Sequence, residues 1–478
     1  MHIPRSPVAR LIAAGSTVAV VALLIVTKES WAHGALKSSV PAAGAHLDRV
    51  PREIRLEFNE TAERAFTRIA LVGPGGKTVA LTPVRIPKDS PRVALASITE
   101  TLGPGVYTVQ WQFGGKDGHP VRGTFKFTIA PGARPDSVES SAGVDSAAMP
   151  HHPPTSIPDN PDPAAFDAQS PLFAAIRWLT FLAAFGIVGA AAFRYAVIAR
   201  VNLVGSAAGL AVVEPALSRA AGIGLAATGL LLVVAIARLY AQSLAMHGPG
   251  EALHGEVVAT MLSATLWGRA WVLQILGAGL GLVGFVAVRR GRFGGWALVG
   301  AASLVVALSL ALSGHAPAAP RWSAAVVIAD TLHVIGAAGW LGSLFFVLFA
   351  GIGAASRLAP EQRGPAVADV ANAFSPTALV FAGLAGITGV FAAWIHLQRL
   401  DALWTSDYGR TLLLKLAVLS VVAGTGAYNW RRVRPALGDE VGARRVRRSA
   451  TAEILVAVVV LGITAVLVAT GTPSAGSP

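Results

Sequence analysis

Hydrophobic and polar residues alternate in short stretches of the chain between residues 33 and 131. The clearest of these stretches are Ile54–Phe58, Val106–Trp111 and Thr124–Ile129, and turns rich in glycine and proline separate them. A period of two is typical of strands that bury one face, because successive side chains point to opposite sides of a sheet. We therefore expect residues 33–131 to fold as a small all-β sandwich or barrel.

A different pattern begins at residue 171, where long apolar runs follow one another almost to the end of the chain. A run of about twenty apolar residues predicts a helix that crosses a bilayer, since a helix satisfies its own backbone hydrogen bonds in lipid. Residues 171–478 are thus expected to form an all-α bundle of eight transmembrane helices. The predicted spans are 172–193, 217–241, 270–288, 294–314, 324–350, 374–396, 411–430 and 451–470.

The first 32 residues have the features of a secretory signal peptide. Arg5 and Arg10 precede an apolar core, Leu11–Val26, and Ser30-Trp31-Ala32 supplies small residues at the two key positions of a cleavage site. Cleavage would make His33 the first residue of the mature protein. The alternative is an uncleaved anchor helix, which would remove the free amine of His33.

Residues 132–170 separate the two predicted domains. They are rich in proline, serine, alanine and aspartate and have no apolar periodicity. We interpret them as a flexible linker.

Composition and charge favour an integral membrane protein over a soluble enzyme. Hydrophobic residues make up 53% of the 478 residues, and charged residues only 14%. Fifteen arginines fall in the predicted loops 194–219, 289–293, 351–373 and 431–450, and four fall in the loops between them. The positive-inside rule places the first set in the cytoplasm and residues 33–131 outside. The net charge of +13 therefore indicates membrane orientation and no nucleic-acid partner.

Three residues of the first domain form a candidate metal site. The sequence lacks cysteine, which excludes thiolate ligands and disulfides. An N-terminal His33 offers an amine and an imidazole, while Asp117 and His119 occupy a short turn between the last two predicted strands. Three nitrogens and one oxygen suit the tetragonal geometry of Cu(II).

Ionisable residues inside the predicted membrane helices are a second group of candidates, because such residues are costly in lipid unless they are partnered or functional. His315, Asp330 and His333 would form a copper path from the outer face towards the midplane. Alternatively, Asp330 pairs with Lys415 or Arg269 as a strut between helices, and His333 is a hydrogen-bonded core residue.

Two neighbouring residues after the second predicted span also have side chains that can bind a metal ion. Met246 and His247 combine a thioether with an imidazole. This pair would suit Cu(I), because soft sulfur ligands favour the cuprous ion.

Two sets of motifs carry a resemblance to known families. Residues 33–130 resemble the CopC family of periplasmic copper-binding proteins, through His33-Gly34-Ala35-Leu36-Lys37-Ser38-Ser39, Pro41-Ala42-Ala43-Gly44, Leu56-Glu57-Phe58-Asn59-Glu60, Gly105-Val106-Tyr107-Thr108-Val109-Gln110-Trp111 and Asp117-Gly118-His119-Pro120. Residues 171–478 resemble the CopD family of copper-resistance membrane proteins, through Ser313-Gly314-His315-Ala316, Asp330, His333, Trp340-Leu341-Gly342, Tyr408-Gly409-Arg410, Lys415, Asn429 and Glu453. The chain is thus similar to a CopC–CopD fusion.

The resemblance implies a Greek-key β-barrel of seven to eight strands that binds Cu(II). It assigns His33, Asp117 and His119 as ligands and Glu60 as an acidic residue beside the N-terminal amine. The methionine-rich Cu(I) site of some family members is missing, because this domain contains no methionine.

These observations predict a copper-binding protein of the bacterial cytoplasmic membrane, with its N-terminal domain on the periplasmic or extracellular side. It would capture Cu(II) and pass it to the membrane domain for import, homeostasis or resistance, without being an enzyme. The expected partners are the copper ion, the lipid bilayer and a periplasmic copper chaperone or reductase. The oxidation state within the membrane is left open.

Two other functions remain as alternatives. The membrane domain could bind haem as a redox protein, with His315 and either His333 or His396 as axial ligands. It could instead serve only as an anchor for a copper sensor or storage domain.

Overall fold

The computed structural model describes residues 36–115, 120–135, 170–318, 322–397, 399–429, 431 and 440–473. The chain divides into two compact units. The β unit comprises the described residues of 31–167 together with 243–265, and the helical unit comprises those of 168–242 and 266–478. The predicted signal peptide, residues 1–32, and most of the predicted linker lie outside the described residues.

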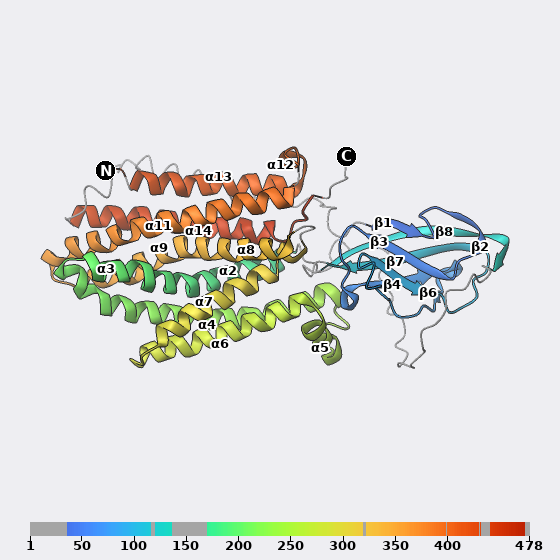
Figure 1. Ribbon diagram of the computed structural model, residues 1–478, viewed down its shortest axis with the longest axis horizontal. Coiled ribbons are helices and arrows are strands. Elements are labelled where there is room, and N and C mark those ends of the chain that lie inside the picture. The colour runs from blue at the N-terminus through green and yellow to red at the C-terminus, as the bar shows by residue number, and fades with distance from the viewer. Residues whose placement is uncertain are drawn as a thin grey trace, which may run out of the picture. The chain divides into compact units, whose positions relative to one another are not determined.

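The β unit is a sandwich of two sheets (Figure 1). One sheet has the order β1-β3-β6 and the other β2-β8-β7-β4-β5, and neighbouring strands are antiparallel except β2 and β8. The sandwich expected from the alternating pattern is confirmed. The strands are β1 Leu36–Val40, β2 His46–Val50, β3 Glu53–Phe58, β4 Arg68–Val72, β5 Thr78–Val79, β6 Val93–Ser97, β7 Gly105–Gly114 and β8 Pro120–Pro135, with short 3-10 turns η1 Arg64–Phe66 and η2 Pro74–Gly76.

Alternation along β3 shows how the sequence builds the core of the sandwich. Ile54, Leu56 and Phe58 are fully buried, whereas Arg55 between them is exposed. The ring of Phe58 packs edge-on against Trp111 of β7, with the ring centroids 5.4 Å apart. Burial of such large aromatic side chains dominates the stability of a small core.

The last strand is longer than its alternating stretch, Thr124–Ile129, predicts. β8 continues to Pro135, because β2 pairs with it in parallel as far as Val50. Cross-strand hydrogen bonds therefore extend the strand through residues that have no alternating pattern of their own.

The helical unit contains eight helices that are long and apolar enough to cross a membrane, within the part of the chain that the structure describes. This confirms the predicted number. The helices are α2 Pro171–Ala192, η3 Phe193–Ile198, α3 Ala199–Val204, α4 Ala207–His247, α6 Leu266–Arg289, α7 Gly295–Leu312, η4 Ala316–Ala318, α8 Ser323–Ala337, η5 Ala338–Gly342, α9 Ser343–Phe346, η6 Val347–Ile352, α10 Gly353–Ala355, α11 Pro360–Leu397, α12 Ala402–Thr405, α13 Asp407–Tyr428 and α14 Glu440–Leu467, and α5 Gly255–Ala264 belongs to the β unit.

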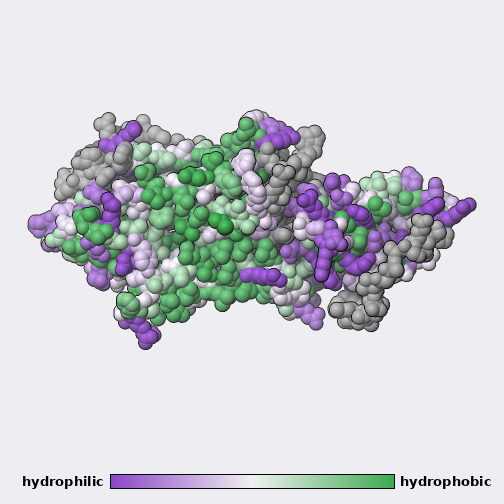
Figure 2. Space-filling model, viewed as in Figure 1, coloured by the Kyte–Doolittle hydropathy of each residue, from purple (hydrophilic) through white to green (hydrophobic). Residues whose placement is uncertain are grey.

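Several helices extend well beyond the apolar runs that predicted them. α4 begins at Ala207 and α11 at Pro360, inside the segments 194–219 and 351–373 that were expected to be loops. Alanine and leucine, which favour helices, fill much of these segments. The short helix α5 was not predicted. Figure 2 shows hydrophobic residues over the middle of the helical unit and hydrophilic residues towards its α3 end.

Glycines allow two of the spans to approach closely. An added Cβ at Gly189 of α2 would lie 2.6 Å from the carbonyl carbon of Gly342, the last residue of η5. The π-helical segment η5 therefore presents its backbone directly to α2. Small residues at such contacts let membrane helices gain van der Waals packing, which replaces the hydrophobic effect as a driving force in lipid.

Candidate metal centre

The predicted ligands His33, Asp117 and His119 lie outside the described residues, but the residues that flank them are placed. Leu36, near the start of the described chain, pairs with Phe58 at the end of β3. Ala62 forms an isolated bridge with Gly115, the residue before the predicted metal-binding turn. The beginning of β1, the end of β3 and the end of β7 therefore meet at one end of the sandwich.

Glu60 lies within this convergence, between Phe58 and Ala62, and is half-buried. A backbone hydrogen bond from Glu63 N to Gly114 O, 2.8 Å long, ties the segment after Glu60 to the end of β7. The structure thus places Glu60 in the chain segment that adjoins both flanks of the predicted site.

Polar contacts between β1 and β3 fix the chain just after the predicted N-terminal ligand. Lys37 Nζ donates to Glu57 Oε1 at 3.3 Å, and Ser38 Oγ donates to Glu57 Oε2 at 3.3 Å. The hydrogen bond from Lys37 is the main cause that holds the pKa of Glu57 below its ordinary value.

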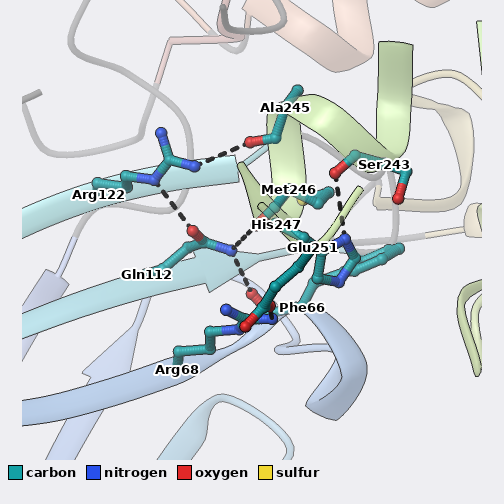
Figure 3. Close-up of polar contacts among 9 residues, drawn as sticks. All are labelled: Phe66, Arg68, Gln112, Arg122, Ser243, Ala245, Met246, His247 and Glu251. Carbon is teal, nitrogen blue, oxygen red and sulfur yellow. Dashed lines mark hydrogen bonds and ion pairs between the residues drawn. The ribbon is translucent and has the colours of Figure 1, made fainter. Parts of the chain in front are cut away.

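Met246 and His247 belong to the β unit, where Figure 3 shows their surroundings. The side chain of Met246 is buried, and its carbonyl oxygen accepts a hydrogen bond of 2.8 Å from Gln112 Nε2. A bond of 3.2 Å joins His247 Nδ1 to the carbonyl of Ser243, and the His247 ring lies 6.4 Å from that of Phe66. His247 therefore lies at the contact between α4 and the sandwich.

Within the helical unit, His315 lies beside a second imidazole that the sequence analysis had considered only as a haem ligand. The ring centroids of His315 and His396 are 6.1 Å apart, and Tyr408 lies 6.2 Å from His396. Asp330 of α8 interacts electrostatically with His315 and with Lys415. The structure thus groups polar residues from α8, α11 and α13 near η4.

His333 has a defined hydrogen-bonding geometry. Its Nδ1 atom lies 2.9 Å from the carbonyl oxygen of Ala385 and 3.2 Å from Thr388 Oγ1. A carbonyl can only accept, so the contact assigns the proton to Nδ1 and leaves the Nε2 lone pair for a ligand. Metal-binding histidines commonly use one ring nitrogen in this way. The same bonds fit a core histidine, so the geometry allows both interpretations.

A metal site built from the described residues alone would require a cluster of side chains that could together bind the ion. No group of three or more histidine, aspartate and glutamate side chains lies close enough there to hold one ion. His315, Asp330 and His333, which the sequence suggested as a copper path, are therefore not gathered into one such group.

The polar contacts that join the sandwich to residues 243–265 leave no signal in the sequence. Arg122 and Gln112 lie more than 120 positions from Ala245 and Met246, whose carbonyls they contact, and no local pattern marks such distant partners.

Three family models match the chain. Residues 36–130 match the CopC domain, residues 167–323 match the N-terminal domain of copper resistance protein D-like proteins, and residues 368–467 match copper resistance protein D.

Known proteins resemble the whole chain or its β part. Copper transport protein CutJ of Bacillus subtilis (strain 168) is 25% identical over 421 residues, which are 86% of this chain and 70% of that protein. Protein YobA of Escherichia coli (strain K12) is 30% identical over 111 residues, 23% of this chain and 90% of that protein. The crystal structure of CopC from Methylosinus trichosporium OB3b is 28% identical and covers 23% of this chain and 100% of its own, with a TM-score of 0.20.

Proposed function

This chain belongs to the CopC–CopD family of copper proteins, and we propose that it captures Cu(II) outside the cytoplasmic membrane and delivers it to its own membrane helices. The family models support a copper protein, and the eight apolar helices support a protein that crosses the membrane several times. The distribution of arginines supports placement of the β unit on the outer side.

The capture site would consist of the amine and imidazole of His33, with Asp117 and His119. One observation carries this assignment: the beginning of β1 and the end of β7 both lie beside the segment that holds Glu60. The segment that holds His33 precedes β1, and the turn that holds Asp117 and His119 follows β7. Both would therefore start from the same end of the sandwich. Glu60 would hydrogen-bond the N-terminal amine and orient it.

Four protein ligands would leave no open equatorial position for a substrate on a tetragonal Cu(II) ion. Such a site binds and transfers copper rather than catalysing a reaction on it, since catalytic metal sites keep an open coordination position. This reasoning supports transport or homeostasis over an enzymatic activity.

Delivery would use the imidazoles of the helical unit. The closeness of His315 to His396 supports a station of two nitrogen ligands, and Asp330 would balance the positive charge of an arriving ion. The Nε2 atom of His333 would form the next station, with its ring held by Ala385. Import of copper would follow from movement along this path.

The first test is a Cu(II) titration of the purified full chain that begins at His33, followed by electron paramagnetic resonance. We expect one tetragonal site per chain. His119→Ala should abolish its signal, and a preparation that keeps Ala32 should bind more weakly because its amine is no longer on the histidine. Equal binding by all three proteins would refute the proposed ligand set.

A further inference from the structure

The β unit contains the last turn of α4, and side chains of the sandwich bind the backbone at that helix end. Arg122 Nη2 donates to the carbonyl of Ala245 at 2.9 Å, and Gln112 Nε2 donates to that of Met246 at 2.8 Å (Figure 3). The last four carbonyls of a helix have no partner within the helix. The negative end of the helix dipole also favours a guanidinium. The sandwich therefore caps α4.

Three strands contribute to this contact in register. Arg68 of β4 pairs with Gln112 of β7, and Gln112 pairs with Arg122 of β8. Residues directly opposite each other on neighbouring strands share a face of the sheet. Arg68, Gln112 and Arg122 thus form one line across the sheet, which we call the docking row.

The docking row is ordered by contacts among its own members. Arg122 Nε donates to Gln112 Oε1 at 3.0 Å, which orients the amide so that its nitrogen faces Met246. Gln112 is 4% exposed and Met246 is 1% exposed, so water is largely excluded from the bond between them. Gln112 Nε2 also donates to Phe66 O at 3.4 Å, so one amide holds both the end of α4 and the turn η1, and loss of the glutamine removes both hydrogen bonds.

An ion pair extends the row beyond the helix end. Arg68 Nη2 lies 2.9 Å from Glu251 Oε2, and both side chains are about a quarter exposed, 29% and 25%. Partial burial reduces the screening that weakens ion pairs on open surfaces. Glu251 lies between α4 and α5, so the row contacts both the helix end and the segment that follows it.

We infer that the docking row holds the β sandwich against residues 243–265, the segment that connects the membrane spans α4 and α6. β7 and β8, which carry two of its residues, are the strands that lead into and out of the predicted turn of Asp117 and His119. The consequence rests on the proposed function: copper is presented from a domain that is docked beside His247.

The test uses the full chain in lipid nanodiscs, labelled with two spin labels at introduced cysteines. The chain has no cysteine of its own, so labelling is specific. Arg64→Cys in η1 and Glu256→Cys in α5 are exposed sites on elements that contact each other. Pulsed double electron–electron resonance of this parent should give a short, narrow distance distribution.

A double variant that carries Gln112→Ala and Arg122→Ala in addition to the two labelled cysteines should broaden the distance distribution and shift it to longer distances. Each lost hydrogen bond to a charged or buried group is expected to shift the docking equilibrium by about tenfold or more. Arg85→Ala is the matched control, because it removes an arginine of the same domain whose partner is Glu53, 3.5 Å away. A narrow distribution in the double variant, or equal broadening in the control, would overturn the inference.

A charge exchange separates docking from a general loss of structure. Arg68→Glu should broaden the distribution, and the addition of Glu251→Arg should restore the narrow one, which a misfolded domain would not allow. Failure of this rescue would count against the ion pair as part of the row. The distances are measured without copper, so a chain that docks but binds no Cu(II) would refute the proposed function and leave the docking row standing.

Discussion

Replacing Gly389 by alanine is expected to displace the imidazole of His333 without removing it. An added Cβ would lie 3.0 Å from Cε1 and 3.4 Å from Nδ1 of that ring. Carbon atoms in contact prefer a separation of about 3.5–4.0 Å, so the ring has to move by roughly half an ångström. His333 is therefore the side chain that yields, because the glycine is part of helix α11.

The cost of this displacement can be worked out from the contacts of the ring. Movement weakens the 2.9 Å bond between Nδ1 and the carbonyl of Ala385, and one net hydrogen bond contributes about 0.5–1.5 kcal/mol. A side chain pushed about 30° from its rotamer costs a further 0.5–1.5 kcal/mol, roughly. The total of about 1–3 kcal/mol corresponds to a loss of about 5- to 150-fold in correctly placed His333.

The assay is the copper content of cells that express each variant at equal levels, measured by mass spectrometry. Gly389→Ala should lower copper delivery in the same direction as His333→Ala. Gly386→Ala is the control, because it lies on the same helix and an added Cβ there meets nothing within 4 Å. Both glycine variants gain about the same helix propensity, roughly 0.5–1 kcal/mol, so their difference isolates the contact with the ring.

Two outcomes would refute this reasoning. If Gly389→Ala behaves as Gly386→Ala does while His333→Ala loses delivery, the ring does not depend on the space that the glycine leaves. If none of the three variants changes the copper content, His333 is not on the path, and a membrane domain that only anchors the sandwich becomes the better explanation.

Gly123→Ala should destabilise the β unit by about 1–3 kcal/mol, because its Cβ would lie 2.4 Å from Trp111 Cζ2. Differential scanning calorimetry of the unfolding transition of the β unit checks this, and Gly103→Ala, which meets nothing within 4 Å, should leave the midpoint unchanged. The carboxyl pKa of Glu57 is lowered in the folded state, so its contribution to stability is present above the unfolded pKa and is lost as the pH falls through the folded pKa. Lys37→Ala should raise the midpoint of a carbon-13 NMR titration of Glu57, and an unchanged midpoint would contradict the assigned cause.

The architecture could be predicted from the pattern of apolar residues because both patterns reflect removal from water, into the sandwich core for the strands and into lipid for helices such as α11, whose apolar window is only 6% buried in the protein. Ile54, Leu56 and Phe58 alternate with polar residues since one side of β3 faces the core. The bounds were less predictable, because they depend on partners that are distant in sequence. Val50 extends β8 to Pro135 through parallel pairing, which leaves no periodic trace in residues 130–135.

The sequence identified single candidate residues by their chemistry, but it did not show which residues lie next to them in the fold. His315 was identified from its rarity in an apolar span, but its neighbour His396 lies 81 positions away and meets it only after folding. The space that Gly389 leaves for His333 is likewise invisible in the sequence, where the glycine is one of 51. The assignment of His33, Asp117 and His119 stays a prediction.

The backbone contact between Gly189 and Gly342 limits how the membrane bundle can open. No side chain lies between α2 and η5 at this point, so no change of rotamer can accommodate sliding of one helix past the other. The first and fifth spans should therefore move as one rigid body. His333 belongs to the fifth span, and its bond to Ala385 reaches α11. Gly336 of α8 brings the fifth span equally close to α11, where an added Cβ would lie 2.8 Å from Ala385 N. The fifth span is therefore held against α2 on one side and against α11 on the other, with the His333 ring at the second contact.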